Sequence, residues 1–541
     1  MAEPTGATAV ADPELEVRRP APVGERETAT FARSGGAMVV SFFLQAALQF
    51  ALVLVVTRAL DAGAAGAFFE GLALFMIVTR WGALGADSGI VRAIPRLRVL
   101  GRSGELGTTI AVAVVPVAVV GVIAAVGVYA AADRLAGAFF DAGHRDVGAQ
   151  ELRLLAAFIP IWLCATVLLA AVRGFGDITF YAVQNAALAA VRPPIVAAVA
   201  VAGLGAAGVT LGWALPTIAA LAGAILLLRR HLRRTDSTAA GPRPSLGAVA
   251  PEFWAYSLPR ALAAVFTVTI TWLDVLLVGR LGSTAEAGVY GVASRLYVVG
   301  AYALQAVGTA AAPQFSELIA AGRRRELERV YQLGTWWTMA ISWPFYALML
   351  VFPMTMMQAF FGSEYSGGGH ALAVLGFAGL LDVGTGNSQA VLLMSGHSRF
   401  YAANTATALV ANVGLNIALV PRFGITGAAV AWAVSIAITN LAALLQVRYV
   451  MGVRPFGRGY RLIGAAALAC FAGVPLLVRT AAGSGVPAFA ASIALASLCY
   501  MVALRRLRDD LELGTLWRAF RPAQPGTVKW TERTGPRGDS R

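Results

Sequence analysis

Four arginines lie inside stretches that are otherwise apolar: Arg80, Arg192, Arg260 and Arg295. An ionised group is costly in an apolar medium, so each must face water, an acidic partner or an anionic ligand. The planar guanidinium donates two parallel hydrogen bonds to phosphate oxygens and stays charged at any physiological pH. We therefore interpret the four as candidates for one water-filled cavity that binds a substrate's phosphates. Ion-paired structural roles and snorkelling at helix ends are the alternatives.

Acidic residues occur in the same kind of stretch, at Glu70, Asp87, Asp274 and Asp382. Asp274 and Asp382 are candidates either for pairing with an arginine or for binding a coupling ion, and pairing is favoured for Asp274. Glu70 and Asp87 lie near the ends of their stretches, where a carboxylate reaches water. Two aspartates neutralise at most two of the four arginines, which leaves a positive surplus that a pyrophosphate would balance.

Two pairs of residues could shape or complete such a cavity. Pro193 and Pro194 directly follow Arg192 and interrupt helix hydrogen bonding, which makes them candidates for a hinge or for a passive kink. Asn412 and Asn416 lie one helical turn apart and are candidates for hydrogen bonds to sugars. A bond that ties their helix to a neighbour is the alternative that we favour.

Enzymatic chemistry is not indicated. The chain has no G-x-x-x-x-G-K-[ST] loop for ATP, its four histidines are scattered, and its three cysteines have no metal-ligand spacing. We expect no enzyme, metal or cofactor. A membrane glycosyltransferase or polymerase is a rival reading, but it would normally need a large outward loop with catalytic carboxylates. The longest outward loop, "DRLAGAFFDAGHRDVGAQE", is short.

The elements that must position these residues are membrane-spanning helices. Of 541 residues, 58% are hydrophobic and 13% charged, which is too apolar for a soluble chain of this length. Apolar runs long enough to span a bilayer recur along the chain and predict an all-α polytopic membrane protein with about fourteen spans. The spans are expected at 36–57, 66–88, 108–130, 152–172, 179–202, 206–228, 253–278, 287–312, 331–360, 369–394, 399–420, 425–447, 462–479 and 485–504.

The net charge of +14 comes from arginines in short loops, which favours the positive-inside rule over nucleic-acid binding. Basic connections lie at 92–102, 229–234, 323–329 and 448–461, whereas the alternate connections carry almost no positive charge. We therefore expect both termini on the cytoplasmic side of a bacterial plasma membrane.

An internal repeat appears when the halves are shifted by about 220 residues. Arg58 and Gly66 match Arg280 and Gly288, G-x-x-x-F-Y-A recurs at 176 and 396, and G-x-x-G-x-x-x-x-W recurs at 205 and 424. Two parallel six-helix bundles are predicted, with a cavity between them and a turn at Pro421 that ends span 11. The expected parts are a disordered tail at 1–34, an N-lobe at 35–228, a linker at 229–251, a C-lobe at 252–447, appended helices at 448–505 and a tail at 506–541.

The stretch from Asn412 to Ala431, with Pro421, Gly424 and Gly427, resembles the penultimate-hairpin signature of polysaccharide-biosynthesis flippases. Their superfamily also includes MATE multidrug exporters and the lipid II flippase. "WLDVLLVGRLGSTAEAGVYGVASRLY" is similar to the family's seventh and eighth helices, and "VTRALDAGAAGAF" to the end of its first helix. The resemblance covers spans 1 to 12.

This resemblance implies a MATE-like fold and a flippase that moves undecaprenyl-pyrophosphate-linked oligosaccharide from the cytoplasmic to the outer leaflet, for cell-surface polysaccharide assembly. Two lobes would rock about a central cavity. The implied partners are the lipid-linked glycan, the bilayer and, further, glycosyltransferases or a polymerase. An ion-coupled exporter of small molecules is the alternative, and its cavity would use carboxylates to bind organic cations.

Overall fold

The computed structural model describes residues 44–236 and 245–507, which form helices and no strand. Residues 1–43, 237–244 and 508–541 lie outside the described part, and with them most of both predicted tails and the middle of the predicted linker. Of that linker, the helices on either side take up the described ends, since one runs to Asp236 and the next begins at Leu246.

The N-lobe contains the helices that precede the linker. They are Leu44–Ala59, α2 (Ala62–Gly82), α3 (Ala86–Val99), α4 (Leu106–Ala130), α5 (Ala132–Phe139), α6 (Arg145–Gly174), α7 (Ile178–Val201), α8 (Gly205–Ala214) and α9 (Pro216–Asp236).

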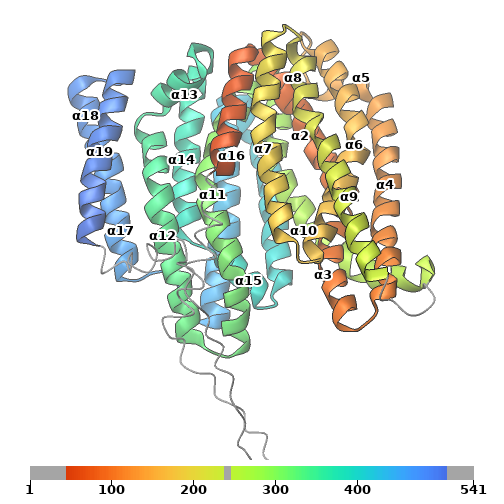
Figure 1. Ribbon diagram of the computed structural model, residues 1–541. Coiled ribbons are helices and arrows are strands. Elements are labelled where there is room, and N and C mark those ends of the chain that lie inside the picture. Colours follow the sequence, from red (N-terminus) through yellow and green to blue (C-terminus); the bar gives the residue numbers. More distant parts are fainter. Residues whose placement is uncertain (1–43, 237–244, 508–541) are drawn as a thin grey trace, which may run out of the picture.

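The C-lobe begins after the linker. It contains α10 (Leu246–Leu281), α11 (Thr284–Ala320), α12 (Arg324–Val351), α13 (Pro353–Phe361), α14 (Gly369–Gly384), α15 (Ser388–Met394) and α16 (Ser398–Met451). The appended helices α17 (Arg458–Leu468), α18 (Val474–Ala482) and α19 (Val486–Arg506) stand at one side of the molecule, where α17 packs on α12 (Figure 1).

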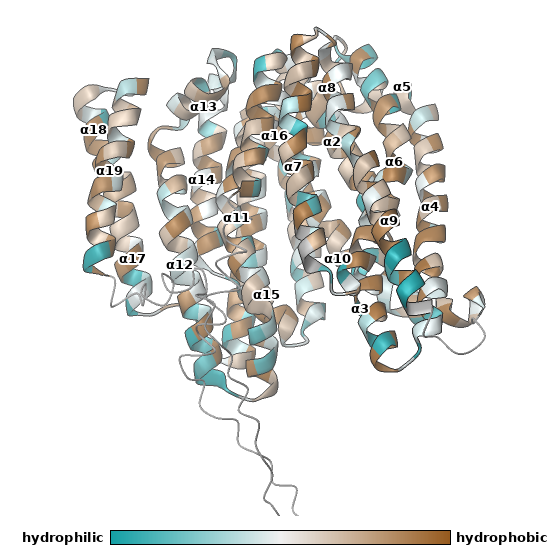
Figure 2. Cartoon of the chain, in the orientation of Figure 1, coloured by the Kyte–Doolittle hydropathy of each residue, from teal (hydrophilic) through white to brown (hydrophobic). Residues whose placement is uncertain are grey.

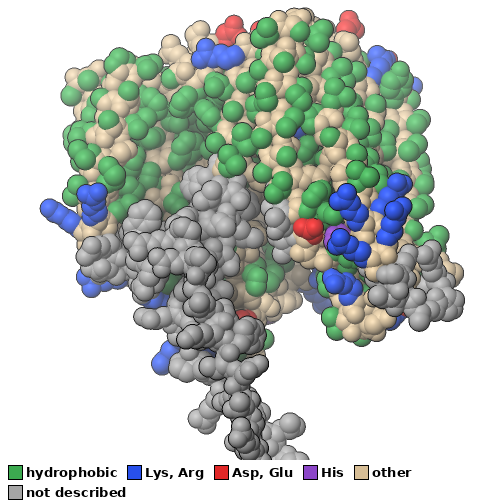
Figure 3. Space-filling model, in the orientation of Figure 1, with side chains coloured by type: hydrophobic (Ala, Val, Ile, Leu, Met, Phe, Trp, Pro, Cys, Tyr) green, Lys and Arg blue, Asp and Glu red, His purple; other side chains and the backbone are tan. Residues whose placement is uncertain are grey.

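The helices form one membrane-sized bundle. Apolar residues dominate its middle, whereas hydrophilic residues gather toward the lower ends of α3, α9 and α12 (Figure 2). The larger groups of Lys and Arg side chains also lie at that lower end (Figure 3). Because the predicted basic connections lie there, we call it the inner end and the opposite one the outer end.

The predicted count of fourteen spans is not confirmed. Within the described residues, eleven helices are long and apolar enough to cross a membrane, or twelve if α12 and α13, which are bent by 97°, make one span. The described first helix, Leu44–Ala59, is shorter, and α16 counts once although it covers predicted spans 11 and 12.

Helix α16 folds back on itself at Gly424, where φ is 54° and ψ is −139°. Asn404 and Gln446 exchange two side-chain hydrogen bonds of 2.8 and 2.9 Å across the two arms, so the arms are antiparallel. The prediction that Pro421 ends the first arm is wrong, because Pro421 stays inside the helix and the glycine takes the positive φ that other residues avoid. Its counterpart in the first repeat, Gly205, also has a positive φ, of 61°.

The two lobes meet most closely where α2 crosses α11 near the outer end. A Cβ atom on Gly66 would lie 1.8 Å from the Thr284 carbonyl oxygen, and one on Gly288 would lie 2.3 Å from the Ala62 carbonyl oxygen. Both glycines are therefore required for this approach. The pairs 62/284 and 66/288 share the shift of 222 residues seen in the sequence repeat, so the contact is symmetric between the lobes.

The orientation can be tested with single cysteines at two exposed positions, Arg233 at the end of α9 and Ser363 just after α13. We expect an impermeant thiol reagent added to intact cells to label Ser363→Cys, and to label Arg233→Cys only after the membrane is opened, because the Arg-rich ends stay in the cytoplasm. Labelling of both positions from outside would contradict the predicted topology.

Candidate functional site: a cavity between the lobes

A cavity of about 360 Å³ lies between the two lobes, within the usual range of about 300–1,000 Å³ for ligand sites. The first helix, α2, α6, α7 and α8 line it from the N-lobe, and α10, α11 and α13 line it from the C-lobe. The wall is mostly apolar, with an aromatic part made of Phe50, Phe68, Phe69, Trp162, Trp213, Trp272, Tyr302 and Phe361.

Arg192 enters the cavity from α7 of the N-lobe. Its guanidinium carbon lies 4.5 Å from the ring centre of Trp213 and 5.5 Å from that of Trp162, and those two rings stack on each other. Its Nε donates to the Trp213 carbonyl oxygen at 3.0 Å, and its Nη2 donates to the Thr217 hydroxyl at 3.4 Å. These contacts fix the side chain without neutralising its charge.

Arg295 enters from α11 of the C-lobe in a similar way. Its guanidinium carbon lies 3.7 Å from the ring centre of Trp272. Its Nε and Nη2 are buried and have no hydrogen-bond partner within the described chain. A buried guanidinium with unused donors is costly unless a ligand or water accepts from it, so this side chain is prepared for an anion.

The two arginines are the charged residues of the cavity wall, and no carboxylate lines it among the described residues. In a low-dielectric site such unbalanced charge attracts anions and repels cations. The arrangement can therefore hold a diphosphate with one guanidinium from each lobe.

Pro193 and Pro194 leave α7 helical from Ile178 to Val201. The prolines remove two backbone donors directly beside Arg192, so the helix is weakened at the point where it carries the cavity arginine. Their role as a hinge remains a prediction.

Arg80 does not line the cavity, and its expected place there is wrong. It sits in the last turn of α2, and its Nη1 donates to Asp87 on α3 at 2.9 Å. Between these helices the chain breaks at Leu84 and Gly85, which both have positive φ. The ion pair thus bridges the break and has a structural role.

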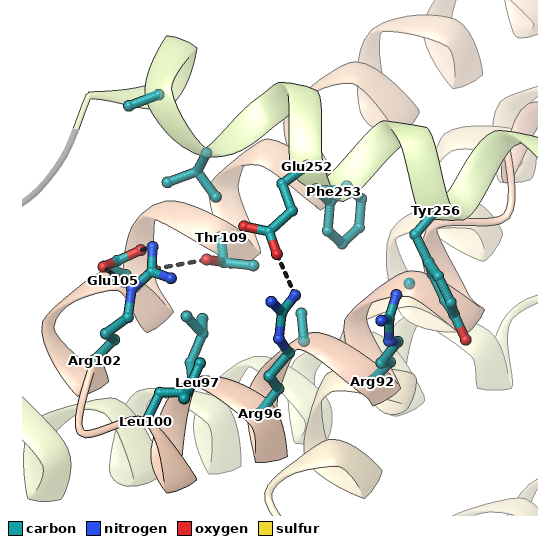
Figure 4. A pocket seen from close by; sticks show the side chains of 14 residues that line it. Arg92, Arg96, Leu97, Leu100, Arg102, Glu105, Thr109, Glu252, Phe253 and Tyr256 are labelled. Atoms are coloured by element: carbon teal, nitrogen blue, oxygen red, sulfur yellow. Dashed lines mark hydrogen bonds and ion pairs between the residues drawn. The ribbon is translucent and has the colours of Figure 1, made fainter.

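Arg260 is also misplaced by the sequence prediction, because it is exposed at the inner end, 3.8 Å from the ring centre of Tyr256 on α10. Arg92 of α3 contacts the same ring at 4.0 Å, and Arg96 forms an ion pair with Glu252 (Figure 4). We call this contact of α3 with α10 the inner seam. It joins the lobes below the cavity.

Asp274 does not pair with an arginine, so that expectation is wrong as well. It is buried within the C-lobe, where it accepts from Tyr290 at 3.0 Å and from the Asn416 side chain at 2.9 Å. Asn412 is buried beside it and its side-chain atoms have no hydrogen-bond partner within the described residues. Neither Asn lines the cavity, so the sugar-binding alternative is not supported. They tie the first arm of α16 to α10.

Asp382 has a similar setting. It accepts from Tyr297 at 2.8 Å and from Asn440 at 2.7 Å, again between helices of the C-lobe. The two aspartates are thus held by neutral donors. A role for either in ion coupling remains a prediction.

Glu70 differs most from its expected place. It was expected near a span end and facing water, but it is fully buried in α2, and neither carboxyl oxygen has a hydrogen-bond partner within the described residues. It faces α10 so closely that a Cβ atom on Gly279 would lie 2.2 Å from its Oε1.

Comparison with known proteins places this arrangement. Residues 259–418 match the MatE family model. Among solved structures, a lipid II flippase MurJ in an inward closed conformation superimposes with a TM-score of 0.66 at 13% identity, over 88% of this chain and 99% of that one. An inward-facing multidrug resistance MATE family transporter of the MOP superfamily gives 0.62 at 15% identity, over 77% and 98%. By fold and by its MatE segment, the chain belongs to the MOP transporter superfamily.

A curated relative of this MOP transporter is the probable low-salt glycan biosynthesis flippase Agl15 of Haloferax volcanii, at 27% identity over 224 residues. The match covers 41% of this chain and 46% of the relative, so it spans about half the length of either protein. The predicted all-α, MATE-like fold is confirmed.

Proposed function

We propose that this MOP transporter is a flippase for a lipid-linked oligosaccharide whose linkage is a pyrophosphate. It would move the glycan from the cytoplasmic to the outer leaflet of a bacterial plasma membrane, with both termini in the cytoplasm. Undecaprenyl pyrophosphate is the carrier that we propose. Glycosyltransferases that supply the glycan and a polymerase that consumes it are the proposed partners.

The observation that carries this proposal is the charge of the cavity. Arg192 and Arg295 face it from opposite lobes, each stacked on tryptophan and neither paired with an acid. Phosphate oxygens accept from guanidinium groups in pairs, so a pyrophosphate suits two such forks. The aromatic wall offers flat apolar faces to a first sugar, while the lipid tail stays in the bilayer.

Alternating access of the two lobes is the proposed mechanism. The inner seam, α3 with α10, and the outer crossing of α2 with α11 close the space below and above the cavity. Each seam consists of a few contacts between otherwise separate bundles, which suits a rocking motion. Substrate would enter when the inner seam opens and leave when the outer seam opens.

The alternative of an exporter for organic cations fits the cavity poorly, because no acid lines it among the described residues. Its test is the same assay with another substrate. The curated and structural relatives are transporters, so no catalytic activity is proposed.

The test is transport by the purified chain in proteoliposomes. A fluorescent undecaprenyl-pyrophosphate oligosaccharide is placed in both leaflets, and a reagent added outside reports how much of it becomes accessible. We expect fast exchange for the pyrophosphate lipid and slower exchange for a monophosphate analogue with the same glycan, because one phosphate engages fewer of the donors. Transport of a cationic dye without any flipping would instead establish the exporter.

A further inference from the structure

Glu70 is a buried carboxyl group that the proposed binding site does not use. It lies on α2 at the outer contact of the lobes, one turn below Gly66, and it is fully buried with no hydrogen-bond partner within the described residues. The Thr284 hydroxyl lowers the cost of its negative charge, but the Asp141 carboxylate raises it. Its closest neighbour across the lobes is the backbone of α10 at Gly279.

The surroundings contain no cation that could balance Glu70. Ionisable groups on the elements packed around it are exposed, as Arg280 is, or are bonded elsewhere. Glu151 accepts from Thr210, Glu286 belongs to the capping box of α11, Asp274 and Tyr290 bond each other, and Asp141 bonds His144 and Thr284.

An ionised carboxylate without partners is very costly in such a place, and a neutral carboxyl group is much less so. When the lobes separate at the outer contact, water reaches the group and favours its ionised form. The closed state therefore binds one proton that the open state releases.

We propose that Glu70 is a proton-binding gate residue: the outer contact between α2 and the ends of α10 and α11 closes when the Glu70 carboxylate takes a proton from the outer solution, and it returns that proton when it opens. One O–H bond forms on closing and breaks on opening, so charge and protons balance. The proposal requires only that the lobes part at the outer end, which belongs to the proposed alternating access, and it does not depend on the substrate.

Asp141 is excluded as the titrating group in the neutral and alkaline range. Burial alone would raise its pKa, but hydrogen bonds from His144 and from the backbone amides of Thr284 and Gly143 outweigh burial and lower the pKa of Asp141 below its ordinary value. It therefore stays ionised while Glu70 changes state. The direction for Glu70 is opposite, since the proton stabilises the closed state: closure is complete at low pH and is lost as pH rises.

The experiment measures the distance between spin labels at Ala142→Cys and Ser363→Cys, two exposed outer positions on opposite lobes, with the native cysteines replaced by alanine. The full chain is studied in nanodiscs without substrate, over a pH series. With one proton bound only in the closed state, the closed-to-open ratio should fall about tenfold per pH unit once the open state is ionised. Glu70→Gln, which is neutral and nearly isosteric, should stay closed at every pH, whereas Asp141→Asn and His144→Gln should keep the response.

An equal pH response in wild type and Glu70→Gln would overturn the proposal, because another group would then titrate. A wild-type distance that ignores pH would also overturn it. The Gly66→Ala variant, whose added methyl group overlaps the Thr284 backbone, provides the open reference. If that variant shows the long distance while wild type never responds to pH, the gate fails but the movement of the lobes stands, and the transport assay remains a separate test of the flippase.

Discussion

Replacing Arg192 and Arg295 by glutamine should abolish flipping of the pyrophosphate lipid while the protein still folds. Each substitution keeps polarity and length but removes the charge and the paired donors. A hydrogen bond to a charged group is worth about 1.5–3 kcal/mol, so each single variant should lose about 10- to 100-fold in apparent affinity. Proteoliposome transport at several substrate concentrations measures this loss.

Arg260→Gln is the matched control, because Arg260 is exposed and stacks on Tyr256 away from the cavity. Its transport should stay within a factor of about two to three of wild type, as expected for a surface substitution. The two cavity variants should also be coupled if both side chains grip the same pyrophosphate, so the double variant should depart from additivity. Normal transport by a well-folded double variant would refute the cationic cavity.

Gly66→Ala should block transport by keeping the outer end open. The new Cβ atom would lie 1.8 Å from the Thr284 carbonyl oxygen, which belongs to a helix backbone and cannot rotate away. The helices must therefore separate, which abolishes the closed outer contact. We expect outer cysteine sites near α11 to become permanently reactive and flipping to fall to the background rate.

Gly127→Ala provides the control for this substitution, since Gly127 is also a helical glycine in a membrane helix but has open space around its Cβ position. It should transport normally and gain slightly in stability from a better helix former. Normal closure and transport by Gly66→Ala would show that the crossing is looser than its geometry indicates.

Much of the fold follows from apolar runs, because a bilayer requires long helices whose lengths and loop charges are legible in one sequence. The hairpin of α16 was also predictable, but not its turning residue. A proline near a predicted turn is a good helix breaker in water, whereas in the membrane Pro421 remains helical and Gly424 turns the chain.

The site was predictable only in part. Arg192 and Arg295 were found because depth along a span is visible in sequence, but Arg80 failed for a reason that depth cannot show. It sits beside a break in its helix, so an acid seven positions later reaches it. Glu70 failed in the opposite direction. Its position near a predicted span end says nothing about the neighbouring lobe that covers it.

The tryptophans that hold the cavity arginines were missed altogether as site residues. Trp162 and Trp213 come from α6 and α8, and their stacking depends on how those helices pack, which no local pattern records. An arginine and tryptophans inside spans of the same lobe were the available signal. That signal becomes specific only when the helices are placed in space.

The crossing of Gly66 with Gly288 bears on how such a chain could arise. If two identical half-length chains once paired in the membrane about a two-fold axis, a residue next to that axis would have met its own copy, as in any isologous dimer. A single glycine in that ancestral subunit would have satisfied both sides of the contact. After fusion of two copies into one gene, the same requirement would rest on two codons that can mutate separately, so either one alone can now break the contact.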